Sequence, residues 1–168
     1  MLPPKLVLAP IDFSEPSLDA LNAAIDIASK YHAEVLLEYA VPMLPKLPSR
    51  ISILDEGEYE QELIKNAEQR LAELAKKVTE KGLSARTSVG LANDAAMEII
   101  RTAEHENVDL IVIATHGMTG WRRLAFGSVT EKVVRTANCP VLVLRSQHAQ
   151  EVAETGSKTS AAAAPSVP

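Results

Sequence analysis

Short apolar runs alternate with segments of helical period along most of this chain. The runs KLVLAP at 5–10, EVLLEYAV at 34–41 and VDLIVI at 108–113 have the length and composition of strands in a parallel sheet, where both faces are covered. Leu83–Val89 alternates enough to predict a more peripheral strand, and Pro140–Leu144 predicts the last one. We therefore expect five strands.

Four segments of helical period separate these strands. Their apolar positions are Leu18, Leu21, Ile25 and Ala28 in the first, Leu63, Ala67, Leu71, Leu74 and Val78 in the second, and Met97, Ile100 and Ala103 in the third, while the fourth covers about 128–137. Ser14, followed by Pro16, and Asp94 are predicted N-caps, and Gly82 is expected to end the second helix.

The resulting order, β-α-β-α-β-α-β-α-β, predicts the α/β class: one open, parallel, five-stranded sheet with helices on both faces. We expect a single domain over residues 1–145. Residues 42–53 contain three prolines and no period, which predicts a loop. Residues 146–168 have almost no large apolar side chains, so we expect a disordered or partly helical tail outside the domain.

Composition limits the classes of partner. A formal charge of −5 argues against a general binder of nucleic acid or of membrane surfaces, so any anion site must be local. The one cysteine, Cys139, cannot form an internal disulfide and is expected to be a small buried residue. Neither a signal-peptide pattern nor a membrane-length apolar run occurs in these 168 residues. These features predict a cytoplasmic protein.

A candidate anion site lies where the fourth predicted strand leads into the fourth helix. Gly117 and Gly127 leave room for backbone to bend or to approach a ligand, and Gly127 is expected to need the backbone freedom of glycine. Ser128 begins a helix, whose free N–H groups attract anions, and Arg122 and Arg123 precede it on the loop. A phosphate fits this pattern, but turn geometry, with Ser128 as a simple N-cap, explains it equally well.

Two other polar residues follow predicted strands. Asp12 could accept hydrogen bonds from a sugar or a base, act as a nucleophile, or simply support the start of the first helix. The nucleophilic role resembles haloacid-dehalogenase phosphatases, but the Asp-x-Asp that they need is missing, because Phe13 and Ser14 follow. His116 could be a base or a metal ligand. No His or Cys lies at metal-binding spacing from it, which favours a structural or phosphate-adjacent histidine.

Several of these segments together resemble the universal stress protein family over Lys5–Arg145. The similar segments are PIDFSEPS at 10–17, THG at 115–117, GSVTEKV at 127–133 and NCPVLV at 138–143. ATP-binding members carry Gly-x-x-Gly, nine residues, and then Gly-Ser or Gly-Thr. Here Ala114 replaces the first glycine, while Gly117, Gly127 and Ser128 match.

The resemblance implies a Rossmann-like fold of the adenine nucleotide alpha hydrolase type and ATP, with or without Mg²⁺, as ligand. It implies that Asp12 contacts the ribose or adenine side, beside Pro10 and Ile11, and that Val41 lines the adenine pocket. Gly117, Gly127, Ser128 and Val129 would present backbone and hydroxyl groups to the phosphates, with Arg122 or Arg123 nearby. The further residues expected to bind the nucleotide are Ala114, His116 and Thr130. It also implies a homodimer through the last strand, 141–145, which would otherwise be an open apolar edge.

The function that follows is an ATP-binding module for stress response and signalling, acting as a homodimer on an unidentified protein partner. A slow ATPase or phosphotransferase is the enzymatic alternative, with Asp12 and His116 as its candidate bases. A third reading is a dimer that regulates partners without binding nucleotide, which Ala114 favours.

Overall fold

The computed structural model of the 168-residue chain describes residues 3–43, 56–115 and 127–145. Its elements, in chain order, are β1 (Leu6–Pro10), α1 (Glu15–Tyr31), β2 (Glu34–Pro42), α2 (Glu56–Thr79), β3 (Ala85–Ala92), α3 (Ala95–His105), β4 (Leu110–Ala114), α4 (Ser128–Thr136) and β5 (Val141–Leu144). The predicted tail at 146–168, most of the predicted loop at 42–53 and the segment 116–126 lie outside the described residues.

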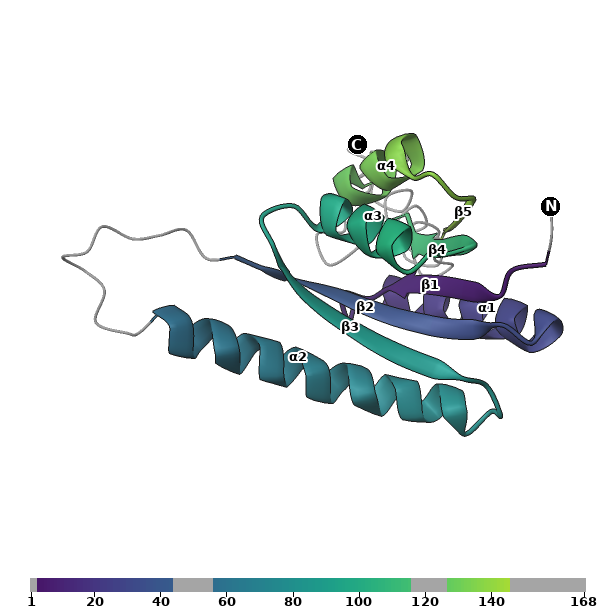
Figure 1. Ribbon diagram of the computed structural model, residues 1–168, viewed down its shortest axis with the longest axis horizontal. Coiled ribbons are helices and arrows are strands. Elements are labelled where there is room, and N and C mark those ends of the chain that lie inside the picture. Colours follow the sequence, from purple (N-terminus) through teal and green to yellow (C-terminus); the bar gives the residue numbers. More distant parts are fainter. Residues whose placement is uncertain (1–2, 44–55, 116–126, 146–168) are drawn as a thin grey trace, which may run out of the picture.

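The five strands form one parallel sheet in the order β3-β2-β1-β4-β5 (Figure 1). Chain connections run from the central strand β1 outward to β3, and then from β4 outward to β5 on the other side. The predicted α/β fold, with its parallel sheet and alternating elements, is confirmed.

The two faces of the sheet carry different helices. On one face, α1 and α2 pack on alternate strand residues such as Val7 and Val35. On the other, α3 and α4 pack on their neighbours Leu8 and Leu36. Leu8 pairs with Leu36 in the β1–β2 register, and Val7 pairs with Val35. Period-two alternation in a parallel sheet thus sends paired residues to the same face, and both faces are covered.

The starts of α1 and α3 follow the predicted caps. Ser14 has extended backbone, and its hydroxyl accepts a hydrogen bond from the N–H of Ser17 at 3.4 Å, with Pro16 in the first turn. The carboxylate of Asp94 accepts from the N–H groups of Ala96 and Met97 at 3.0 and 3.3 Å. Both caps satisfy donors that have no partner inside the helix.

Three details differ from the sequence prediction. Met97 was expected on the buried face of α3 but is 46% exposed, because the buried stripe runs through Ala96, Ile100 and Ala103 and excludes it. β3 extends to Ala92 rather than Val89, since its pairing with β2 continues to Pro42. Cys139 is only partly buried, against the α3/α4 core.

Candidate functional site

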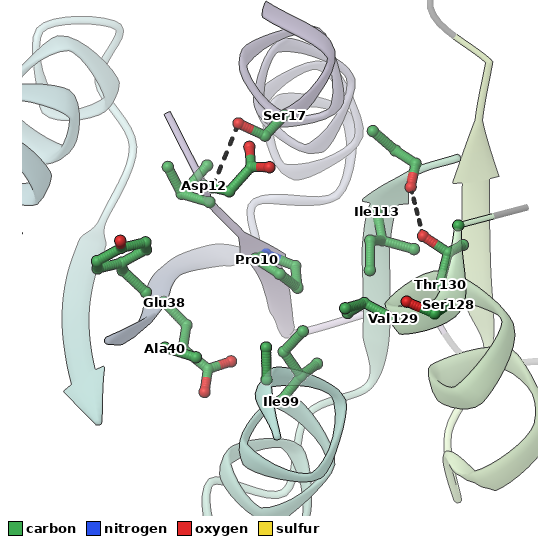
Figure 2. A pocket seen from close by; sticks show the side chains of 15 residues that line it. Pro10, Asp12, Ser17, Glu38, Ala40, Ile99, Ile113, Ser128, Val129 and Thr130 are labelled. Atoms are coloured by element: carbon green, nitrogen blue, oxygen red, sulfur yellow. Dashed lines mark hydrogen bonds between the residues drawn. The ribbon is translucent and has the colours of Figure 1, made fainter. Parts of the chain in front are cut away.

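A cleft of about 310 Å³ opens at the carboxyl ends of the strands, on the α3/α4 face. It lies over the β1–β4 junction, where the order of connections reverses and where ligands bind in open α/β sheets. Its lining consists of Pro10, Ile11, Asp12, Ser17, Glu38, Tyr39, Ala40, Ala95, Ile99, Ile113, Ala114, Gly127, Ser128, Val129 and Thr130 (Figure 2). Most of these residues follow or end a strand, or begin α4.

Eight residues predicted for the site line this cleft together. They are Pro10, Ile11, Asp12, Ala114, Gly127, Ser128, Val129 and Thr130. His116, Gly117, Arg122 and Arg123 lie outside the described residues, and their roles stay predictions.

Val41 does not line the cleft, and Ala40 does. Neighbouring side chains alternate across a strand, so Val41 shares the side of Leu37, which belongs to the α1/α2 core. Val41 is 1% exposed. From β2 the cleft is lined by Glu38, Tyr39 and Ala40, so its wall ends one residue before the predicted Val41.

The N-terminus of α4 lies at the cleft. Gly127 is the N-cap, and no side chain of the described residues caps the helix, so the prediction of Ser128 as N-cap is wrong. Gly127 has φ −70° and ψ 157°, a conformation open to any residue, so the expected need for glycine's backbone freedom is also wrong. The first N–H groups of a helix have no partner within it, and here they lie at the cleft.

Two hydrogen bonds hold this helix start against the end of β4. The N–H of Gly127 donates to the carbonyl of Thr115 at 2.7 Å. The hydroxyl of Thr130 donates to the carbonyl of Ala114 at 2.7 Å, and Thr130 is buried. Figure 2 shows Thr130 and Ser128 together at one side of the cleft. The hydroxyl of Thr130 thus supports the site by fixing α4 to β4.

Asp12 stands in a tight turn between β1 and α1. Its Oδ1 accepts hydrogen bonds from both the N–H, at 3.0 Å, and the hydroxyl of Ser14, the N-cap of α1. The residue between them, Phe13, has φ 62°, in the left-handed region. Of the roles weighed for Asp12, the structure confirms its support of the helix start. Contact with a ribose or a base stays a prediction.

An aromatic and cationic stack fixes this turn from the α1/α2 side. The ring of Phe13 lies 5.0 Å from that of Tyr39, centroid to centroid, and the guanidinium of Arg70 lies 3.6 Å from the centroid of the Phe13 ring. Such contacts are attractive because the ring face is electron-rich. They help to hold Phe13 in a backbone conformation that a bulky residue rarely adopts.

The sequence prediction missed Glu38, a carboxyl in the cleft wall. Glu38 is 1% exposed, and its Oε1 accepts a hydrogen bond from the hydroxyl of Thr102 at 2.8 Å. Among the described residues, Oε2 has no hydrogen-bond partner. Burial, the largest cause, raises the pKa of Glu38 from its ordinary 4.5 to about 7. One signal could have found it: a charged residue in the middle of the apolar run EVLLEYAV.

The described ranges lack both a metal-binding cluster and a membrane-spanning helix. No group of three or more His, Cys, Asp or Glu side chains there is arranged to hold a metal ion. None of the helices in those ranges combines the length and the apolar composition that crossing a bilayer requires.

The profile of the universal stress protein family matches residues 4–145. The chain is 38% identical over 144 residues to the universal stress protein MJ0531 of Methanocaldococcus jannaschii, covering 84% of this chain and 82% of that one. The solved structure of MJ0577 from the same organism superimposes with a TM-score of 0.72 at 29% identity, covering 87% of this chain and 99% of that one.

A third similar protein has been solved with a nucleotide. It is the universal stress protein of Archaeoglobus fulgidus in complex with dAMP, which has a TM-score of 0.60 and 20% identity and covers 85% of this chain and 98% of that one. At this identity the likeness concerns the fold.

Proposed function

This chain belongs to the universal stress protein family, and from that premise we propose that its cleft binds an adenine nucleotide, ATP in particular. The observation that carries the proposal is the N-terminus of α4, which lies at the cleft and which no side chain of the described residues caps. Backbone N–H groups and the positive end of the helix dipole together favour a phosphate there. Ser128, exposed in the first turn, adds a hydroxyl beside them.

The rest of the cleft suits the purine ring of a nucleotide. Apolar side chains of Ile99, Ile113 and Val129 line it, and Pro10 of β1 and Ala40 of β2 add apolar surface from the sheet. Concave, mostly apolar walls with few polar groups are typical of small-molecule sites. The fold relative from Archaeoglobus fulgidus, solved with dAMP, supports an adenine nucleotide as the occupant.

The predicted phosphate motif is compatible with this assignment. Ala114, which replaces the family's first glycine, ends β4, is 7% exposed and turns its carbonyl to Thr130. Its methyl group is therefore largely buried beside the helix start. Gly117, Arg122 and Arg123 would complete the phosphate side, as the family resemblance implies.

We propose further that the protein works as a homodimer through β5, coupling nucleotide binding to a protein partner. β5 is an edge strand, and Leu142 on it is 39% exposed. An unpaired edge with exposed apolar side chains is stabilised by pairing with a second copy. Sedimentation velocity should show a dimer that Leu142→Arg dissociates, whereas Tyr59→Arg, at a similarly exposed site on α2, should not.

Thermal melting with Mg-ATP tests nucleotide binding. A ligand at about 100 times its Kd adds roughly 2.7 kcal/mol to the free energy of unfolding, which raises the Tm of a domain of this size by several degrees. Nucleotide that copurifies with the protein, released by heat and identified by chromatography, would name the ligand directly. An unchanged Tm at millimolar Mg-ATP, with no copurified nucleotide, would instead favour a dimer that binds none.

A further inference from the structure

Glu38 is a carboxyl placed in an otherwise apolar part of the cleft wall. It lies on β2 two residues before Ala40, and Figure 2 shows its side chain directed toward Ile99 of α3. The same view places it on the opposite side of Pro10 from Ser128 and Thr130. It is therefore remote from the proposed phosphate position, where a second negative charge would repel the ligand.

The hydrogen bonds of this carboxyl are incomplete. Oε1 accepts from Thr102, while Oε2 is buried and has no partner among the described residues. Leaving a buried acceptor unsatisfied is costly, and more so for a charged group. The arginine nearby does not relieve it, because the guanidinium of Arg101 is hydrogen-bonded to Glu98.

We propose that Glu38 reads the base of the bound nucleotide, with Oε2 accepting a hydrogen bond from the exocyclic amino group of adenine. This inference rests on the proposed nucleotide-binding function. An ionised carboxylate only accepts hydrogen bonds, and the amino group of adenine only donates them. The terminal torsion of a Glu side chain is soft, so Oε2 can turn toward the cleft.

The proposal makes the preference for adenine depend on pH. Within the described residues, the charged groups that act on Glu38 are Glu98, which raises its pKa, and Arg101, which lowers it, both from α3. With a pKa of about 7, the carboxyl is mostly ionised at pH 8 and mostly protonated at pH 6. A donor from the ligand stabilises the ionised form, so the amino group should strengthen binding more at pH 8 than at pH 6.

The test compares ATP with purine riboside 5′-triphosphate, which lacks the amino group and adds no donor. Calorimetric titrations of the wild type and of Glu38→Leu, at pH 6, 7 and 8, give the ratio of the two affinities. Both ligands carry the same triphosphate, so the effect of its own protonation on binding cancels in this ratio. We expect the wild type to prefer ATP roughly tenfold at pH 8, the lower end for a hydrogen bond to a charged group, and less at pH 6.

Glu38→Leu should bind both ligands equally well, and Glu38→Gln should show a preference that no longer changes with pH. Melting curves of the ligand-free variants verify that they fold. If Glu38→Leu does not fold, the test rests on whether the preference of Glu38→Gln for ATP changes with pH. A wild type that binds both ligands equally overturns this inference alone, as does a preference retained in Glu38→Leu. A wild type that binds neither ligand overturns the proposed function as well.

Discussion

The hydroxyl of Thr130 in the first turn of α4 donates a 2.7 Å hydrogen bond to the carbonyl of Ala114, the last residue of β4. Both residues are buried and line the cleft, and 15 residues of chain separate them. Together with the bond from the N–H of Gly127 to the carbonyl of Thr115, it joins the start of α4 to the end of β4.

Replacing Thr130 by valine removes this hydrogen bond while keeping the shape of the side chain. The buried carbonyl of Ala114 then loses a partner, so we expect the free energy of unfolding to fall by about 1–3 kcal/mol. Urea unfolding measures the change. The matched control is Ser128→Ala in the same turn, where Ser128 is exposed and does not cap the helix, and a change within about 0.5 kcal/mol is expected. Equal losses in both variants would contradict this assignment.

Gly127→Asp separates the phosphate site from the fold. The backbone of Gly127 already has the extended conformation of an N-cap, so an aspartate should cap α4 and leave the apo Tm unchanged or slightly higher. Its carboxylate would occupy the free N–H groups and repel the phosphate, so ATP affinity should fall at least about tenfold, as the loss of one charge-assisted hydrogen bond would produce.

Gly127→Asn is the neutral control, because it caps the helix without the charge and should weaken ATP less. Titrations of both variants at two salt concentrations measure the electrostatic part, which salt screens. ATP binding by Gly127→Asp at wild-type strength would place the phosphates elsewhere.

Gly90 in β3 lies directly beneath the carboxylate of Glu98. A Cβ added there would lie 2.1 Å from Oε1 and 2.7 Å from the carboxyl carbon, closer than atoms can approach. Gly90→Ala should therefore displace the carboxylate of Glu98, but this group is the far end of a flexible side chain, so the loss of stability should be about 1 kcal/mol or less. Thermal or urea melts measure this loss.

A double-mutant cycle shows whether Glu98 is the cause. In a Glu98→Ala background the same Gly90→Ala change should cost much less, because the clashing carboxyl has been removed. Equal costs in both backgrounds would show that the backbone of β3, rather than Glu98, requires glycine at this position.

The buried carboxyl of Glu38 should make stability depend on pH. Its pKa in the fold, about 7, is higher than the ordinary 4.5, so the folded state binds more protons than the unfolded state between these values. Its contribution to stability is therefore fully present below pH 4.5, decreases as the pH rises and levels off above about 7. Roughly 3 kcal/mol is the upper size of this effect.

Glu38→Gln replaces the titrating carboxyl by an amide that does not ionise. The stability of this variant relative to the wild type should rise from pH 5 to pH 7 and stay constant from pH 7.5 to pH 8.5, as measured by urea unfolding. A relative stability that is flat over the whole range would mean that Glu38 titrates normally in the folded protein.

Local patterns in the sequence determined the order of the elements and most of their limits. Caps such as Ser14 and Asp94 act within three residues of themselves, and the strand at 34–41 is recognisable from its own composition. Parallel pairing follows, because each strand is joined to the next by a helix. For the same reason the strand ends that carry Asp12 and Ala114 could be expected at one edge of the sheet.

Only the tertiary structure decided which side chains face the cleft. The burial of Glu38 depends on the packing of α3 over β2, and its partner Thr102 is 64 residues away in the sequence. The cleft includes Ala40 but not Val41, which lies on the side of Leu37 in the α1/α2 core, and the composition of a strand covered on both faces does not reveal which helices cover which face. Serine is a residue type typical of N-caps, yet Gly127 rather than Ser128 occupies that position. The hydrogen bonds that Gly127 and Thr130 donate to the carbonyls of Thr115 and Ala114 set where α4 begins. These are contacts between segments distant in the chain, and no local pattern encodes them.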